Sequence, residues 1–275
     1  MKYLNSYVNF LNKSIKLKKP LSVVFDCSNG TTGIVLKKLK IPFSKKIILN
    51  SKPDGNFPAH GPNPSSFKAL KQLSSTVKKT KADLGIAFDA DGDRAFFVDE
   101  TGKFIEPYLI AYLLFLNNKP PFVADITTFE SLNYAKIAQP KTFLSRNGTY
   151  FIKKEMLKRK ANVGAEFSGH YYFKDFFYAD SGIFTAIKVI NIVSKLPYSL
   201  SNFKKLIPRQ VTVKEFNFKS IDYKKITEKL IQLYQKKSKK IIKTDGITFE
   251  FKKGWFTIRP SNTEQLIRLY IGKVL

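Results

Sequence analysis

The densest group of carboxylates in the sequence lies in segment 88–94, which reads FDADGDR and follows an apolar run directly. Three carboxylates at alternate positions of one tight loop repel one another unless a cation lies between them. Such hard oxygen ligands suit Mg²⁺, which keeps its other positions for water and a phosphate oxygen. We therefore predict that Asp89, Asp91 and Asp93 bind Mg²⁺ at a phosphoryl-transfer site, with Arg94 as a charge-assisted donor to the phosphate.

Two other interpretations of this loop are weaker. An EF-hand calcium loop begins with similar spacing, but it needs glycine at its sixth position, where this segment has Arg94. An acidic turn at the end of a strand is common without any ligand, but three aspartates so close together are unfavourable without a cation. The sequence therefore favours the magnesium site.

A second group of polar residues lies in segment 164–170, which reads GAEFSGH. Its small residues let the backbone approach a ligand. Glu166 and Ser168 alternate, so both can point into one cleft and hydrogen-bond the vicinal hydroxyls of a sugar. His170 is open to two interpretations, because a lone histidine is more often structural than a ligand contact.

A third group lies in segment 259–264, which reads RPSNTE and is expected between two strands near the C-terminus. Its guanidinium, hydroxyl and amide groups, together with the loop N–H groups, can enclose a phosphate dianion. The residues concerned are Arg259, Ser261, Asn262 and Thr263, with Arg268 just beyond them. Taken alone, the segment fits a polar turn equally well.

The apolar runs around these loops predict two consecutive α/β domains followed by a smaller α+β domain. In the first domain we expect strands at 21–26, 46–49 and 84–88, with helices at 34–39, 66–79 and 107–116. In the second we expect a strand at 122–125 and helices at 131–137, 150–158 and 181–194. The third would contain a helix at 222–235 and several short strands. The expected domains span residues 1–116, 117–205 and 206–275.

The excess of basic residues is large, with 48 Lys and Arg against 21 Asp and Glu and a net charge of +27. A polyanion-binding protein is one hypothesis for such a charge. The lysines are spread along the whole chain, however, and the densest run, at 236–240, lacks an RNA-binding aromatic signature. We therefore favour solvated faces over a nucleic-acid site.

The sequence also bears on the compartment. No segment approaches the apolar length that spans a bilayer, so we expect no membrane association. The single cysteine, Cys27, excludes an internal disulfide framework and fits the reducing cytoplasm. Residues 1–19 are basic and place Leu4, Val8 and Leu11 at helical spacing, which fits either a transit peptide or a core-packing helix. We favour the helix, because no cleavage-site pattern is present.

Together, and in this order, the three loops resemble the signature loops of the α-D-phosphohexomutase superfamily, which includes phosphomannomutases and phosphoglucomutases. Members of that family have four domains with one such loop each. Nearly the whole chain takes part in the resemblance, through further segments at 24–33, 53–58, 62–64 and 172–180. The resemblance implies the family's fold without its first domain, which carries a phosphoserine.

The resemblance also implies a role for each loop. The acidic loop would hold Mg²⁺, and its Arg94 would be a catalytic residue at the reacting phosphate. His170 would be a second catalytic residue, beside the sugar-binding Glu166 and Ser168. The non-reacting phosphate of the substrate would be held by Arg259, Ser261, Asn262 and Thr263, with Arg268 beside them.

The activity that the resemblance implies is the interconversion of hexose 1-phosphate and hexose 6-phosphate through a bisphosphate, formed when the phosphoserine gives its phosphoryl group to the substrate. The sequence has no counterpart of the family's Ser-His loop, and Thr149 stands where the family usually has a histidine. We expect a phosphohexomutase subunit that takes its phosphoserine domain from a separately encoded chain. The alternative is a non-catalytic protein, derived from a mutase, that still binds hexose phosphates.

Overall fold

The computed structural model describes residues 2–64, 67–137, 141–219, 222–261 and 264–274. The chain falls into two compact units, each built from two separate stretches of sequence. The first unit comprises Met1–Asn118 and Ser168–Leu206, and the second comprises Lys119–Phe167 and Ile207–Leu275. The three domain ranges expected from the sequence remain a prediction.

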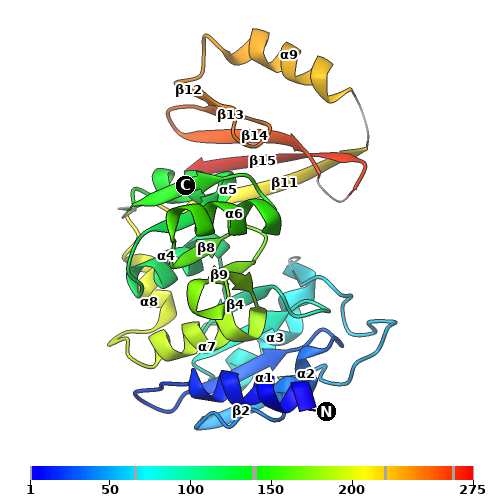
Figure 1. The fold of residues 1–275 in the computed structure, drawn as a ribbon, viewed down its shortest axis with the longest axis vertical. Coiled ribbons are helices and arrows are strands. Elements are labelled where there is room, and N and C mark those ends of the chain that lie inside the picture. The colour runs from blue at the N-terminus through cyan, green and yellow to red at the C-terminus, as the bar shows by residue number, and fades with distance from the viewer. Residues whose placement is uncertain (1, 65–66, 138–140, 220–221, 262–263, 275) are drawn as a thin grey trace. The chain divides into compact units, whose positions relative to one another are not determined.

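The first unit contains a five-stranded sheet in the order β2-β1-β3-β4-β5. Figure 1 labels its strands β2 and β4. Strands β1, β2 and β3 run parallel, whereas β4 and β5 are antiparallel to their neighbours. The elements in the first stretch of this unit are α1 (Lys2–Lys13), β1 (Ser22–Asp26), α2 (Thr32–Leu36), β2 (Lys45–Leu49), α3 (Phe67–Thr80), β3 (Leu84–Phe88), β4 (Ala95–Asp99), β5 (Phe104–Ile105) and α4 (Pro107–Leu116).

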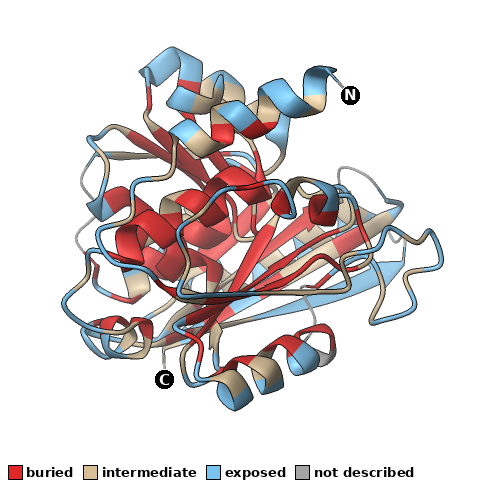
Figure 2. Ribbon diagram, turned by 90° about the horizontal axis from the view of Figure 1, so that it is seen from below, coloured by how far each residue is buried: buried red, intermediate tan, exposed pale blue. Residues whose placement is uncertain are grey.

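Helix α3 covers one face of this sheet. Its apolar residues Leu70, Leu73 and Val77 recur at helical spacing and are buried against the strands. A Cβ on Gly85 of β3 would lie 2.7 Å from a Val77 methyl group, so glycine allows the helix to approach closely. Figure 2 shows buried residues gathered on the strands and the helices that pack against them. This packing holds β3, and with it the start of the acidic loop, in a fixed position.

The second stretch of the first unit adds β9 (Tyr171–Phe173), η1 (Lys174–Phe176), β10 (Ala179–Asp180), α7 (Gly182–Val193) and α8 (Leu200–Lys205). Helix α7 is buried along nearly all of its length and contacts α4 and β4. Helix α1 lies against it, since Phe10 stacks on Phe184 and the Tyr7 hydroxyl is 3.2 Å from Ser181 Oγ. The N-terminal residues thus form the core-packing helix that their spacing predicted.

The first part of the second unit has three parallel strands in the order β8-β6-β7. Its elements are β6 (Phe122–Asp125), α5 (Ile126–Tyr134), β7 (Thr142–Ser145), α6 (Thr149–Arg159) and β8 (Val163–Ala165). Helix α5 begins directly after β6 because the Asp125 carboxylate accepts a hydrogen bond from Thr128 N at 2.9 Å and so caps the helix. The sequence predicted the start of this helix at residue 131, which was too late in the chain.

The rest of the second unit is an antiparallel sheet in the order β11-β15-β14-β13-β12. Its elements are β11 (Val211–Lys219), α9 (Tyr223–Tyr234), β12 (Lys240–Ile242), β13 (Ile247–Glu250), β14 (Gly254–Pro260) and β15 (Leu266–Val274). Helix α9 lies on one face of the sheet and α5 on the other (Figure 1). No helix among the described residues is both long and apolar enough to cross a bilayer.

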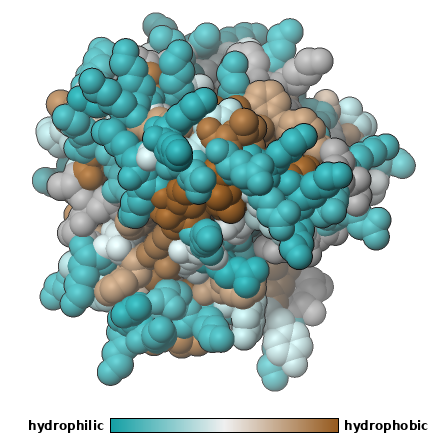
Figure 3. Space-filling model, turned by 90° about the horizontal axis from the view of Figure 1, so that it is seen from above, coloured by the Kyte–Doolittle hydropathy of each residue, from teal (hydrophilic) through white to brown (hydrophobic). Residues whose placement is uncertain are grey.

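Helix α9 covers only part of its face of this sheet. Beside it lies an apolar hollow, lined by Phe218, Ile226, Leu230, Tyr234, Phe256, Ile258, Ile267, Leu269 and Ile271. Figure 3 views the molecule from the side on which Figure 1 labels α9, and it shows apolar side chains gathered within a hydrophilic surface. Strand β11 is the edge strand of the sheet, and its Phe216 and Phe218 are 42% and 44% exposed.

Candidate functional site

The acidic loop after β3 is held by contacts with two other segments of the first unit. A Cβ on Gly30 would lie 2.2 Å from the Ala90 carbonyl oxygen, so the close approach of these two backbones leaves room only for glycine. Gly182 N, at the start of α7, donates to the Gly92 carbonyl at 2.9 Å. Contacts within the first unit therefore hold the backbone of the loop on two sides.

This shape brings the predicted metal ligands together. One carboxylate oxygen from each of Asp89, Asp91 and Asp93 lies within 4.8 Å of the others. Asp89 is buried and Asp91 is exposed, so the group faces outward from a buried base. Burial raises the pKa of Asp89 to about 6, although the charge of Arg94 acts to lower it. An all-carboxylate set of hard oxygens fits Mg²⁺, and binding of the ion here remains a prediction.

Arg94 pairs with one of these carboxylates. Its Nε forms a short ion pair with Asp89 Oδ2, and its backbone N donates to Asp89 Oδ1 at 3.1 Å. Its Nη1 donates to Asn63 Oδ1 at 3.4 Å. The contact of Arg94 with a substrate phosphate remains a prediction.

His170 and Ser168 lie beside the acidic loop in the first unit. The Ser168 hydroxyl is 2.8 Å from His170 Nδ1, and His170 Nε2 is 3.3 Å from Asp93 Oδ2. Burial acts to raise the pKa of Asp93, but the hydrogen bond and charge of His170 lower it overall. Asp93 and His170 also form a second group of possible metal ligands with Asp180, which the sequence analysis did not single out.

Glu166 belongs to the second unit, whereas Ser168 belongs to the first. The Glu166 side chain is buried, and its Oε1 accepts a hydrogen bond from Gly148 N. Gly148 has φ 117°, a conformation that favours glycine, and it precedes the first residue of α6, Thr149. The pairing of Glu166 with Ser168 around one sugar remains a prediction.

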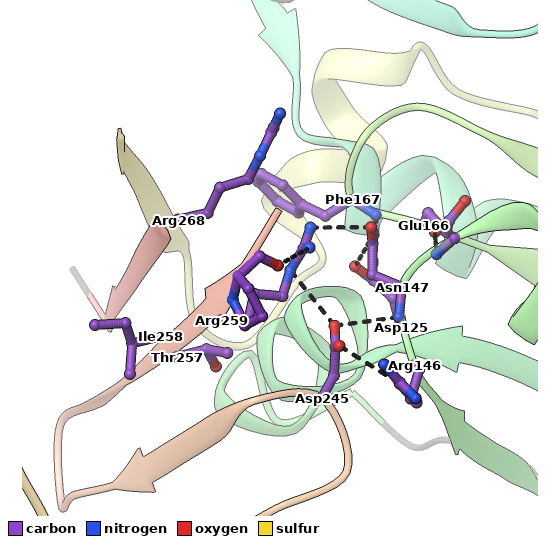
Figure 4. Close-up of polar contacts among 12 residues, drawn as sticks. Asp125, Arg146, Asn147, Glu166, Phe167, Asp245, Thr257, Ile258, Arg259 and Arg268 are labelled. Carbon is purple, nitrogen blue, oxygen red and sulfur yellow. Dashed lines mark hydrogen bonds and ion pairs between the residues drawn. The ribbon is translucent and has the colours of Figure 1, made fainter. Parts of the chain in front are cut away.

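Arg259, near the end of β14, is buried and has polar partners on all three of its guanidinium nitrogens (Figure 4). Its Nε lies 3.4 Å from Asp245 Oδ2, and its Nη2 donates to Asn147 Oδ1 at 2.9 Å. Its Nη1 donates to the Pro260 carbonyl at 3.3 Å. Since a guanidinium has five N–H donors, these three contacts with described residues use only part of its capacity to donate.

Two other residues of the predicted phosphate site, Ser261 and Arg268, are among the described residues. Arg268 is the register partner of Arg259 across β14 and β15, and it pairs with Glu264 at 2.6 Å and with Glu215 at 3.1 Å. The backbone N of Ser261 donates to the Leu266 carbonyl at 2.8 Å. The two remaining predicted residues, Asn262 and Thr263, lie outside the described residues.

Three further polar residues of the second unit belong to this site, and the sequence analysis gave none of them a role. They are Asp125, Asn147 and Asp245, which connect Arg259 to the end of β6. Burial raises the pKa of both Asp125 and Asp245, while Arg259 acts to lower each of them. The signal that could have pointed to Asp245 is the pair Asp245-Gly246, an acidic residue and a turn residue just before a predicted strand.

Family models for phosphoglucomutase/phosphomannomutase match nearly the whole chain. The alpha/beta/alpha domain II model matches residues 1–102, the alpha/beta/alpha domain III model matches residues 109–210, and the C-terminal domain model matches residues 215–273. The predicted fold class, two α/β domains followed by a smaller domain with an antiparallel sheet, is thereby confirmed.

Curated relatives carry related names. A protein of Xanthomonas campestris pv. campestris named phosphohexose mutases is 34% identical over 278 residues, covering 98% of this chain and 61% of its own length. A phosphomannomutase of Methanocaldococcus jannaschii is 34% identical over 277 residues, covering 97% of this chain and 60% of its own length. The chain thus spans about three fifths of the length of these relatives.

Solved structures agree with this similarity. A phosphoglucomutase/phosphomannomutase family protein from Burkholderia thailandensis superposes with a TM-score of 0.80 at 25% identity, over 99% of this chain and 60% of that one. The phosphoglucomutase parafusin from Paramecium superposes with a TM-score of 0.72 at 19% identity, over 100% of this chain and 57% of that one. The second likeness concerns the fold alone.

Proposed function

Because the chain belongs to the phosphoglucomutase/phosphomannomutase family, we propose that it binds a hexose phosphate and takes part in interconverting hexose 1-phosphate and hexose 6-phosphate. The observation that carries this proposal is the grouping of the Asp89, Asp91 and Asp93 carboxylates within 4.8 Å, beside Arg94. Phosphoryl transfer needs this combination, since most of its catalysis is positioning and charge stabilisation.

In this proposal the first unit handles the reacting phosphate. Asp89, Asp91 and Asp93 would hold Mg²⁺, which when bound neutralises charge on the phosphoryl group in transfer. Arg94 would contact an oxygen of the same group. His170, oriented by its contact with Asp93, would hydrogen-bond a sugar hydroxyl beside the reacting centre and hold or move a proton there.

The second unit would hold the rest of the substrate. Glu166 would accept hydrogen bonds from sugar hydroxyls, as Ser168 would from the first unit. The non-reacting phosphate would be bound by Arg259, Ser261, Asn262, Thr263 and Arg268. The burial of Arg259 supports this assignment, because a charge-assisted hydrogen bond is stronger where water is excluded.

We propose that turnover also needs a phosphoserine domain supplied by a separate chain. The models matched are those of domain II, domain III and the C-terminal domain. The described residues include the predicted metal and sugar loops and part of the predicted phosphate loop. The alternative, a binding protein without catalysis, is favoured by one observation. Thr149 stands where the family resemblance leads us to expect a histidine, so a candidate proton-transfer group is missing. It is the first residue of α6 and follows Gly148, whose N donates to Glu166.

A pair of measurements on the purified chain tests the proposal. With Mg²⁺ and a hexose 1,6-bisphosphate, we expect calorimetric binding of glucose 1-phosphate or mannose 1-phosphate without turnover. Robust turnover by the chain alone would refute the need for a partner. If neither sugar phosphate binds, the proposed function is wrong. Turnover that appears on adding an isolated phosphoserine domain would decide for the enzyme over the binding protein.

A further inference from the structure

Asp125 is the buried anchor of a chain of polar contacts that runs through the second unit (Figure 4). Its Oδ1 accepts hydrogen bonds from Thr128 N at 2.9 Å and from Phe167 N at 3.2 Å. Its Oδ2 accepts from Asn147 Nδ2 at 3.4 Å. One carboxylate thus fixes the start of α5, the residue after Glu166 and the side chain of Asn147.

Asn147 connects this anchor to Arg259. While its amide nitrogen faces Asp125, its amide oxygen accepts the hydrogen bond from Arg259 Nη2 at 2.9 Å. An amide has one donating and one accepting end, so only this orientation satisfies both neighbours. The backbone N of Asn147 in turn donates to Asp245 Oδ2 at 3.2 Å. Both the main chain and the side chain of Asn147 are therefore held in place.

Asp245 completes the arrangement from the other side of Arg259. Its Oδ2 lies 3.4 Å from Arg259 Nε, and each of the two side chains is only 5% exposed. Gly246 makes this approach possible: it has φ 66°, and a Cβ there would lie 2.2 Å from the Ile258 carbonyl oxygen. The guanidinium of Arg259 is thus fixed by Asn147 on one nitrogen and by Asp245 on another.

We infer that Asn147 is a positioning residue for the phosphate-binding guanidinium of Arg259. A guanidinium binds phosphate best when its plane is set in advance, because less conformational entropy is then lost on binding. Asn147 sets this plane from the same Asp125 carboxylate that holds the segment after Glu166. The sugar-binding and phosphate-binding elements of the second unit therefore share one anchor. This inference rests on the proposed function.

A double-mutant cycle on ligand affinity tests the inference. We expect Asn147→Ala to weaken glucose 1-phosphate or mannose 1-phosphate binding about tenfold. In an Arg259→Ala background the same substitution is expected to cost less than about twofold, because the group through which it acts is gone. Additive effects of the two substitutions, or an unchanged affinity of Asn147→Ala, would overturn the inference.

A matched control separates positioning from general destabilisation. Asn162 lies in the same unit, and its Nδ2 donates to the Lys119 carbonyl at 2.7 Å. This hydrogen bond does not belong to the chain of contacts that holds Arg259. Asn162→Ala should lower the midpoint of thermal unfolding but leave the affinity unchanged. If it weakens the hexose phosphate as much as Asn147→Ala does, the effect is on stability and the inference fails. Should Asn147→Ala fail to fold, Asn147→Ser replaces it in the cycle.

A readout without any ligand distinguishes this inference from the proposed function. In ¹⁵N NMR spectra the Arg259 Nε–H should exchange slowly with water, because it is buried against Asp245. We expect Asn147→Ala to shift this signal and to speed its exchange at least tenfold. An unchanged signal would overturn the positioning role. A shifted signal in a chain that binds no hexose phosphate would support the positioning of Arg259 and refute the proposed function.

Discussion

His170 Nε2 lies 3.3 Å from Asp93 Oδ2, so the residue just before β9 meets the acidic loop that follows β3. A second hydrogen bond lies within two residues of this contact on each segment, where Ala95 N donates to the Gly169 carbonyl at 3.1 Å. These two contacts join both stretches of the first unit at its candidate metal site. The acidic loop therefore orients His170. A substitution in that loop should change both the metal site and the orientation of this histidine.

Removing one carboxylate should weaken the metal site. Asp91→Asn is expected to lower Mg²⁺ affinity at least about tenfold, because it removes the negative charge of one of the three grouped carboxylates. Calorimetry on the metal-free chain provides the measurement. Asp83→Asn is the matched control, since Asp83 is exposed at the opposite end of β3. Equal Mg²⁺ affinities for Asp91→Asn and the parent chain would contradict the assignment of this loop.

The two ends of the predicted substrate site should respond differently to mutation. Arg259→Ala is expected to weaken both hexose 1-phosphate and inorganic phosphate at least about tenfold, which is about 1.4 kcal/mol. Glu166→Ala should weaken the hexose phosphate but not inorganic phosphate, because its proposed partners are sugar hydroxyls. Calorimetric titration with both ligands separates the two effects.

A control for this pair is Arg159→Ala, which removes a guanidinium from the surface of α6, where it pairs with Glu155 at 2.7 Å. Its affinity for both ligands should match that of the parent chain. If Arg259→Ala binds hexose phosphates as well as the parent does, segment 259–264 is only a polar turn.

Glu130 should make the stability of the second unit fall as the pH rises. Burial, reinforced by the charge of Glu250, raises the pKa of Glu130 from 4.5 to about 7. Between these values the unfolded chain has lost a proton that the folded chain still binds, so unfolding becomes easier with rising pH. The full effect is roughly 3 kcal/mol, reached above pH 7 and absent below about pH 4.5.

Urea unfolding at two pH values measures this contribution. Glu130→Gln is expected to match the parent at pH 4.5, where both side chains are neutral, and to be more stable at pH 8. Glu228→Gln, on the exposed surface of α9, should show no such pH-dependent difference. A Glu130→Gln variant that differs from the parent equally at both pH values would contradict a buried proton at this site.

The sequence predicted the parts of the fold that depend on local pattern. The apolar run at 84–88 and the helix at 107–116 have the bounds that the structure gives to β3 and α4. Helix α5 was placed too late, because Thr127 and Thr128 are β-branched and read as strand or loop, whereas the Asp125 cap makes them the first turn of a helix.

In the candidate site, too, contacts between residues close in the sequence could be predicted, and contacts between distant residues could not. Asp89, Asp91 and Asp93 lie within five residues of one another, so their grouping follows from spacing alone. The contact between Asn147 and Arg259 spans 112 positions in the sequence, and no local pattern predicts it. His60 is a similar case: it was given no role from the sequence, and its 3.1 Å contact with the buried Asp26 exists only in the folded chain.

Strand β11 lies at one edge of the second unit's sheet, where β15 is its only strand partner among the described residues, and this position has a consequence for handling the protein. An uncovered edge strand with exposed aromatic residues is a template on which a second chain can add its own strand, which is how many proteins begin to aggregate. Phe216 and Phe218 provide such a surface here, while Lys214 and Lys219 flank them within the same strand. In a parallel, in-register stack of this strand, Lys214 and Lys219 would each meet the same lysine of the next chain, and this repulsion disfavours such a stack. Two of the chain's many lysines thus lie where their charge opposes the pairing of β11 with a second copy of itself.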